Sequence, residues 1–474
     1  MGEGPGERGL PTIEPRFHYE DIPPMNAITE AFLAAQHPAA PRVPEGRLWS
    51  AEDLRDPYPL YAALRASAPI HWSDTLFGGA WIISRQQEAE SVLRDTQHFS
   101  AQRTGGWVMG GEPGEGEGRH SRQELTKFQQ LISRAFLFVD GADHARLRGL
   151  LHAGFTPSGL EALRPWLAQR IEQLLDALEA AHAARPEEPV DFIQHLARQL
   201  PACVIARVLG LPPGDEARVM AWSDEIAVFI GEPVPEASAA RRAQRGLLLM
   251  AAFLEREFAN RRVAQARGEG YGEGLIGLLL QAQDDGRITD ADELMAQTTM
   301  LLFAGHETTR YLLGNLVQTL LAHPEQWQRL QAQPDPALIH AAVREVLRYE
   351  CPVQYTGRRV AVAHEFAGQR LKRGDAVIVL IGAANRDAER FEQPERFDVT
   401  RRGRASLAFG TGAHVCIGAS LSMMEAELVL AAVLRRWPGL RLADAQAQWQ
   451  GNPLYRGLTR LPLWLTPGQT DPRS

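Results

Sequence analysis

The sequence has few cysteines and no long apolar run. Its 474 residues include three cysteines, Cys203, Cys351 and Cys416. They are too few and too far apart for a disulfide framework or for a zinc site built on CxxC pairs. No window approaches the roughly 18 apolar residues of a membrane span, and the N-terminus lacks the basic and apolar regions of a signal peptide. We therefore expect a cytoplasmic protein of a reducing compartment that does not bind membranes.

An excess of positive charge is also missing. Fifty Lys and Arg residues face 58 Asp and Glu residues, and the formal net charge is −8. This balance excludes the global positive field that holds nucleic acid. Lysine itself is nearly absent, with only Lys127 and Lys372, which indicates a compositional bias of the genome rather than a function. An apolar fraction of 45% and a charged fraction of 23% are typical of an ordinary globular enzyme, and a monomer is the default expectation.

The chain divides into an extension and one large body. Residues 1–50 are rich in Pro, Gly and Glu and show little periodicity, so they are interpreted as a flexible N-terminal extension. Residues 51–474 are expected to form a single catalytic domain. Within it, residues 104–121 hold seven glycines and predict a long loop, which is either a lid over a binding site or a plain insertion.

Periodicity within the body predicts a mainly α-helical fold with a small β part. Apolar residues recur at steps of three and four through most of residues 143–350. Residues 353–381 change to short β-prone runs separated by glycine-containing turns, and a last long helix is expected over about 418–436. The runs IHWSD and AWIISR, near residues 70–85, predict a pair of strands. The expected class is α+β, dominated by helices.

One long helix is predicted from about Asp290 to Ala322, with Thr289 as its N-cap. It is apolar on almost every side, so it should cross the middle of the fold, and its polar residues need a reason. They gather in residues 304–309 (AGHETT), where small residues permit close approach and an acid adjoins a hydroxyl, the parts of a proton relay. The alternative is structural: Thr308 bonds back to a carbonyl, and Glu307 is a surface or paired acid.

Two further segments carry candidate residues. Glu345 and Arg348 stand three apart on a predicted helix and can form a bidentate ion pair, a common structural feature. Cys416 lies between a glycine-rich loop and the start of a helix, where free backbone N–H groups and the helix dipole favour a thiolate. Gly410, Gly412 and Gly418 would let a flat bulky group lie against the loop. The alternative for Cys416 is inert packing.

Taken together, these segments resemble the cytochrome P450 family of haem-thiolate monooxygenases, in particular its bacterial soluble type. The resemblance covers about residues 53–465. The stretch 409–418 (FGTGAHVCIG) agrees with the haem loop of the family at every defining position. Residues 304–309, the ExxR pair at 345–348 and the PERF segment at 394–397 occur in the family's order along the chain.

The resemblance implies a cofactor, haem b, with Cys416 as the thiolate ligand of its iron. It implies that Thr308 and Glu307 deliver protons to bound oxygen, and that Glu345, Arg348 and Arg396 form a buried ion-pair triad behind the haem loop. The resemblance also implies a set of haem-contacting residues, with Arg359 as an alternative to Arg358: His144, Arg148, Ala304, Arg358, Phe409, Gly410, His414, Cys416 and Gly418.

The expected function is insertion of one oxygen atom from O2 into a small to medium apolar metabolite. Desaturation or oxidative coupling with the same oxidant is the first alternative, and a non-catalytic haem sensor is the least favoured one. The segment after Cys416 is too short for a fused reductase, so electrons are expected from a separate NAD(P)H-dependent ferredoxin reductase and ferredoxin. Arg401, Arg402 and Arg404 could form a basic patch for an acidic ferredoxin, or an ordinary solvated loop.

Overall fold

The computed structural model describes residues 37–44, 48–102, 130–231, 237–444 and 446–465. The chain divides into two compact units, Met1–Ala39 and Ala40–Ser474. Only residues 37–39 of the first unit are described. The predicted loop over residues 104–121 lies outside the described residues.

The folded body begins earlier than the sequence suggested. Backbone hydrogen bonds join Val43 N to the Trp72 carbonyl (3.1 Å) and Trp72 N to the Pro41 carbonyl (2.7 Å). The segment from Ala40 therefore belongs to the larger unit, and the predicted boundary near residue 50 was too late. Sequence periodicity missed this segment because it pairs with a strand through its backbone and does not form a regular element of its own.

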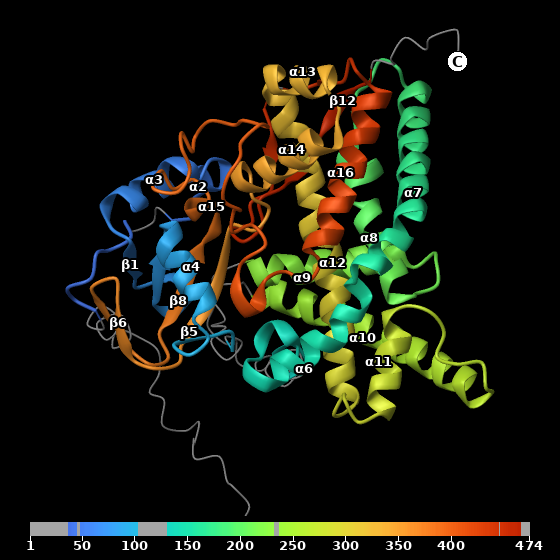
Figure 1. The fold of residues 1–474 in the computed structure, drawn as a ribbon, viewed down its shortest axis with the longest axis horizontal. Helices are drawn as coiled ribbons and strands as arrows, with labels where there is room; N and C mark the ends of the chain where they lie inside the picture. Colours follow the sequence, from blue (N-terminus) through green and yellow to red (C-terminus); the bar gives the residue numbers. More distant parts are fainter. Residues whose placement is uncertain (1–36, 45–47, 103–129, 232–236, 445, 466–474) are drawn as a thin grey trace, which may run out of the picture. The chain divides into compact units, whose positions relative to one another are not determined.

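Helix α12 (Ala291–Ala322) runs through the middle of the helical part, as predicted (Figure 1). It contacts α8 (Gln199–Leu209), α9 (Glu216–Gly231), α10 (Ala237–Ala266) and α16 (Ala419–Arg436). Its N-cap is Asp290, which accepts a hydrogen bond from Glu293 N, while Glu293 accepts one from Thr289 N. The predicted cap at Thr289 was wrong by one residue, because the Asp290 carboxylate caps the helix and Thr289 only donates its backbone N–H to Glu293.

The main sheet has five strands in the order β1-β2-β8-β5-β3. The predicted strand pair is confirmed: β1 (Ile70–Ser73) and β2 (Ala80–Ile83) are antiparallel and fully buried. Strand β8 (Ala376–Leu380) pairs parallel with β2 and antiparallel with β5 (Tyr355–Val360), and β3 (Phe99–Ser100) closes the edge. In Figure 1 this sheet lies to one side of the helices, near α3 (Tyr58–Ser67) and α4 (Gln86–Arg94).

The remaining elements complete a mainly helical α+β fold, the predicted class. The other helices are α2 (Ala51–Arg55), α6 (Gly141–His152), α7 (Pro157–Ala184), α11 (Leu275–Asp284), α13 (Pro324–Ala332), α14 (Pro336–Tyr349) and α15 (Ile381–Ala384). Small sheets pair β4 (Val190–Asp191), β12 (Pro462–Trp464) and β9 (Arg441–Leu442); β10 (Gln448–Trp449) and β11 (Leu458–Arg460); and β6 (His364–Phe366) and β7 (Gln369–Leu371).

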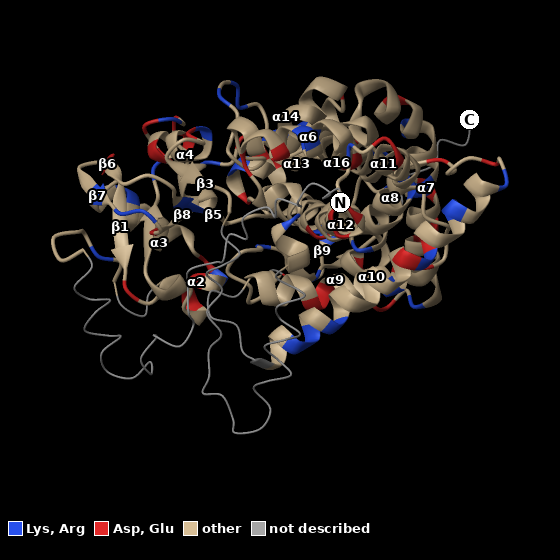
Figure 2. Ribbon diagram, turned by 90° about the horizontal axis from the view of Figure 1, so that it is seen from below, with Lys and Arg blue, Asp and Glu red and all other residues tan. Residues whose placement is uncertain are grey.

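Two surface properties bear on function. Among the described residues, no helix has the length and hydropathy that crossing a bilayer requires. Basic and acidic residues are both distributed over the helices of the described part, as Figure 2 shows. This mixture agrees with the balanced composition of the sequence.

Candidate functional site

A large cavity lies between α12, strand β5 and the loop that precedes α16. The centre of a water molecule could move through about 370 Å³ of it. Its lining is mostly apolar, with Cys416 in the loop and Thr308 on α12 among the polar exceptions. Such a cavity with a few convergent polar groups is the usual form of a small-molecule site.

The loop before α16 presents Cys416 to this cavity. Cys416 N donates to the Phe409 carbonyl at 2.8 Å, which closes the loop on itself. Gly410 and Gly412 have φ angles of +67° and +75°, in the left-handed region that glycine favours. A Cβ on Gly412 would also lie 2.8 Å from the Leu93 carbonyl oxygen, whereas one on Gly410 would find only ordinary contacts. The glycines thus shape the loop and let it approach α4.

The thiol of Cys416 is exposed to the cavity yet withdrawn from bulk water. Burial raises its pKa, and the Gly418 N–H group and Arg148 oppose this only in part. The Gly418 N–H group favours the thiolate, as expected of the loop, but desolvation outweighs it. A metal ion bound at the sulfur would supply the missing positive charge, because coordination deprotonates a thiol.

Positive and imidazole groups gather near one end of the cavity: His414 and Arg358 line it, whereas His144 and Arg148 are not among its lining residues. Burial lowers the pKa of His144 to about 4, so its imidazole is neutral. The rings of His144 on α6 and His414 in the loop are 4.0 Å apart. His144 Nε2, His414 Nδ1 and Arg148 Nη1 are buried with no hydrogen-bond partner. Among the described residues, Asp140 is the acid that contacts them: its carboxylate lies 3.5 Å from His414 Nε2.

Arg358 joins this group from β5. It lines the cavity, is only 6% exposed, and its Nη1 donates to the Gly357 carbonyl at 2.8 Å. Burial lowers its pKa to about 10, which is the signature of a guanidinium without a close carboxylate. Arg359 also lines the cavity but is half exposed and bonds the Gly374 carbonyl, so the geometry favours Arg358.

These orphaned donors fit a ligand that carries two acidic groups. Buried cations cost free energy unless they are paired, and two carboxylates at this end of the cavity would satisfy them. A flat group lying across the glycine-rich loop, with a metal at the Cys416 sulfur, meets both conditions. The residues present therefore fit a haem, with its propionates toward His144, Arg148, His414 and Arg358. Phe409, Gly410 and Gly418 line the same side of the cavity.

On the opposite wall, α12 presents Ala304 and Thr308. Thr308 Oγ1 donates to the Ala304 carbonyl at 3.5 Å, a long hydrogen bond, so the hydroxyl is nearly free for another partner. Gly305 permits the close approach that was predicted. It lines the cavity, and a Cβ there would meet the Ile205 side chain of α8 at 2.5 Å, so this glycine also admits a neighbouring helix.

Glu307 does not reach the cavity lining. It is fully buried on another side of α12, with Oε1 3.0 Å from His306 Nε2 and 3.4 Å from Arg310 Nη1. Burial opposes ionisation, but His306 and Arg310 hold the pKa of Glu307 at about 2. Arg310 also pairs at 2.8 Å with Asp224 of α9. The predicted acid–alcohol pair is thus split between a buried charged cluster and the cavity wall.

The predicted ion-pair triad has a different third member. Glu345 and Arg348 form the expected bidentate pair, with two N–O distances of 2.8 Å. Arg401 Nε, at 3.0 Å from Glu345 Oε1, takes the place predicted for Arg396. The Arg396 side chain is exposed, and only its carbonyl accepts bonds from Arg348 and Arg401. The sequence motif marks the turn correctly, but the backbone of Arg396 makes the contact.

Sequence reasoning missed two polar residues of the cavity, Ser422 and Glu425. Ser422 Oγ lies 3.0 Å from Thr309 Oγ1 and so links α16 to α12. Glu425 is 1% exposed, its Oε2 has no hydrogen-bond partner, and burial raises its pKa well above the usual value. The sequence did contain a signal for them: Ser422 and Glu425 stand three residues apart, on an otherwise apolar face of the predicted last helix.

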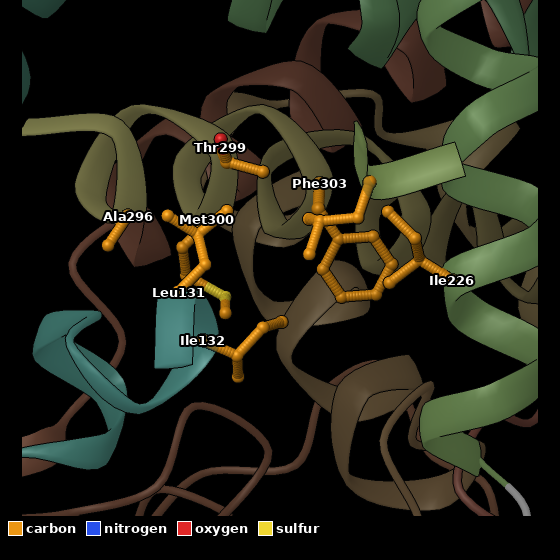
Figure 3. Close-up of a pocket in the computed structure, with 8 residues that line it drawn as sticks. Leu131, Ile132, Ile226, Ala296, Thr299, Met300 and Phe303 are labelled. Atoms are coloured by element: carbon orange, nitrogen blue, oxygen red, sulfur yellow. The ribbon is translucent and has the colours of Figure 1, made fainter. Parts of the chain in front are cut away.

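A small apolar side pocket adjoins the cavity (Figure 3). Met300 and Phe303 of α12 line both spaces and therefore separate them. Leu131, Ile132 and Ile226 complete its wall.

Comparison with known proteins agrees with this geometry. A family model described as cytochrome P450 matches residues 108–439. The chain is 36% identical over 413 residues to the cytochrome P450 monooxygenase PikC of Streptomyces venezuelae, covering 86% of this chain and 91% of PikC. It is 32% identical to the biotin biosynthesis cytochrome P450 of Bacillus subtilis, covering 87% and 97%. The crystal structure of CalO2 superposes with a TM-score of 0.76 at 32% identity, covering 89% of this chain and 98% of CalO2.

Proposed function

The chain belongs to the cytochrome P450 family of haem-binding monooxygenases, and from this premise we propose that it hydroxylates or epoxidises a small to medium apolar metabolite. The observation that carries the proposal is the cavity itself. The loop before α16 presents a cysteine thiol, buried nitrogen atoms without a hydrogen-bond partner lie near one end, and α12 offers a nearly free hydroxyl. No other cysteine among the described residues lines this cavity.

Holding the cofactor is the first task of these residues. We assign the iron ligand to Cys416 and the propionate contacts to His144, Arg148, His414 and Arg358. When bound, the haem activates O2 so that one oxygen atom enters the substrate and the other leaves as water. The loop glycines add no side chain to this side of the cavity and leave room for a flat group.

Proton supply is the second task. Thr308 Oγ1 faces the cavity and can donate a proton there while accepting another from a water molecule. Glu307 does not line the cavity. With His306 and Arg310 it maintains a charged cluster next to Thr308 on the same helix. A non-catalytic haem sensor would need neither the hydroxyl nor the acid.

The substrate is bound by an apolar surface. Phe77, Phe136, Leu301, Val353 and Tyr355 line the cavity and offer contact area with few directional groups. Because this apolar lining excludes water, it also disfavours side reactions with water. Desaturation or coupling would use the same residues, and product mass separates the outcomes: oxygenation adds one oxygen atom, whereas desaturation removes two hydrogens.

Electrons are proposed to come from an NAD(P)H-dependent ferredoxin reductase and a ferredoxin, with the enzyme working as a monomer in the cytoplasm. The patch suggested for ferredoxin needs revision. Arg401 is bound to Glu345 and its side chain is only 15% exposed, so Arg402 and Arg404 remain as the exposed cations of that segment.

The test is the carbon monoxide difference spectrum of the reduced, haem-loaded protein. We expect the strongly red-shifted band of thiolate ligation, which Cys416→Ser should abolish. Cys203→Ser is the matched control, because Cys203 is buried against Arg170 on α7 and does not line the cavity. A band typical of histidine ligation, or the same spectrum in both variants, would refute Cys416 as the ligand and with it the proposed function.

A further inference from the structure

Three aromatic rings from distant parts of the chain meet beside the cavity. Trp49 precedes α2, Phe77 lies in the connection between β1 and β2, and Tyr355 begins β5. The Trp49 and Tyr355 rings are 4.9 Å apart, Phe77 and Tyr355 are 5.8 Å apart, and Trp49 and Phe77 are 6.2 Å apart. These distances lie in the range of favourable aromatic pairs, so the three rings form one cluster, called here the aromatic wall.

Only two of the three rings touch the cavity. Phe77 and Tyr355 line it, whereas Trp49 packs behind them without lining it. Tyr355 is also fixed from another direction, because its hydroxyl donates to the Gly231 carbonyl at the end of α9 (3.3 Å). Trp49 thus lies on the outer side of the aromatic wall and limits how far the two lining rings can retreat.

The backbone at two of these residues is unusual. Trp49 and Phe77 have φ angles of +67° and +54°, a left-handed conformation that bulky residues rarely adopt. Such conformations persist only where surrounding contacts over-determine them, and they concentrate at ligand clamps and similar sites. The ring contacts of the aromatic wall hold both residues.

We propose that Trp49 is a positioning residue that holds Phe77 and Tyr355 in place and thereby sets the size limit for the ligand. This inference rests on the proposed function, because it assumes that the cavity receives a ligand beside a haem. It gives the segment before α2 a role in specificity, although that segment contributes no side chain to the described cavity lining.

The test compares a small and a bulky nitrogen ligand, imidazole and 4-phenylimidazole, by spectral titration of the haem-loaded full chain. In Trp49→Ala the lining rings gain space, so the ratio of the two dissociation constants should shift in favour of the bulky ligand by at least roughly tenfold. Trp49→Phe keeps a ring and should retain the wild-type ratio. Trp222→Ala is the matched control, since Trp222 pairs with Phe253 away from the cavity.

A second variant separates this role from a loss of folding. Phe77→Gly removes a lining ring and at the same time relieves the left-handed backbone, which offsets part of the lost packing, so it should relax ligand size selection while the chain still folds and binds haem. Unchanged ratios in Trp49→Ala and Phe77→Gly, or a shift against the bulky ligand, would overturn the inference. Failure of both ligands to change the wild-type haem spectrum would instead count against the proposed function.

Discussion

Thr308 and Glu307 are neighbours on α12, yet only the threonine hydroxyl reaches the cavity. Successive residues of a helix point about 100° apart, so adjacent side chains face different partners. The acid is left among His306, Arg310 and Asp224, and the hydroxyl is left nearly free. At the scale of the residue, the proton delivery that we propose therefore depends on Thr308.

Replacing Thr308 with Ala should uncouple oxygen consumption from product formation. The fraction of electrons recovered in product should fall at least roughly tenfold, because a positioned proton donor contributes on the order of 10² or more in rate. The measurement is product formed per NAD(P)H consumed. Thr298→Ala on the same helix is the control: its buried hydroxyl bonds the Leu294 carbonyl and should not affect coupling. Equal coupling in both variants would point to another proton donor.

Glu425 should make stability fall as pH rises. Its pKa is raised well above 4.5 in the folded protein by burial, so the folded chain keeps a proton that the unfolded chain releases. Above pH 4.5 the free energy of unfolding should decrease by about 1.4 kcal/mol per pH unit from this group, until the folded pKa is reached.

Glu425→Gln removes that titration. Chemical denaturation at several pH values should show the variant gaining on the wild type as pH increases, with the two converging near pH 4.5. A constant difference between the two proteins across this range would mean that Glu425 is already ionised in the folded state. Glu427, exposed enough to pair with His340 on the surface, offers a control position on the same helix.

At the scale of the element, the loop before α16 combines two constraints that glycine alone meets. Gly410 needs only the left-handed backbone, whereas Gly412 needs that backbone and also the space beside Leu93 and Arg94 of α4. The loop is therefore held against α4 by backbone packing. Its geometry at Cys416 depends on that contact.

Replacing Gly410 or Gly412 with Ala should lower stability by different amounts. Gly410→Ala should cost about 1–2 kcal/mol of stability from backbone strain alone. Gly412→Ala should cost more and also lower the haem-to-protein ratio, because the new methyl group would overlap main-chain atoms that cannot rotate away. Thermal unfolding and haem content after purification measure both effects. The opposite order would show that the contact with α4 is easily relaxed.

Much of the fold and of the candidate site could be predicted from the sequence, and the predictions that were wrong or missing share a cause. Local patterns gave the central helix, the first strand pair and the last long helix, because these elements have strong periodicity. Arg401 was missed as the partner of Glu345 since ion pairing between distant segments leaves no local pattern. The same holds for Trp49 and Ala40, whose environments are made by β5 and β1. Which side of α12 Glu307 faces depends on α9, which sequence spacing does not place.

At the scale of the whole molecule, the loop that carries Cys416 faces the cavity, and the segment before this loop exposes Arg402 and Arg404. Arg402→Ala with Arg404→Ala should slow reduction by an acidic ferredoxin several-fold and weaken its salt dependence, because long-range attraction is lost. Reduction by dithionite should not change. Stopped-flow reduction at two salt concentrations measures this.

Arg401→Ala provides the contrast. Arg401 is held by Glu345 and by backbone carbonyls behind the loop, so its removal should lower haem retention and stability whatever the electron donor. If the Arg402 and Arg404 double variant behaved in this way as well, the exposed arginines would be structural and the docking patch would lie elsewhere.

The parallel pairing of β2 with β8 joins residues about 300 positions apart, Ala80 with Ala376. During synthesis the first hairpin is complete long before its partner strand has left the ribosome. At about 5–20 residues per second, the wait is roughly 15–60 s. Throughout that time one apolar strand edge is available to other chains. Yield in a cell should therefore depend on chaperones and growth temperature, and slower growth at low temperature should favour soluble product.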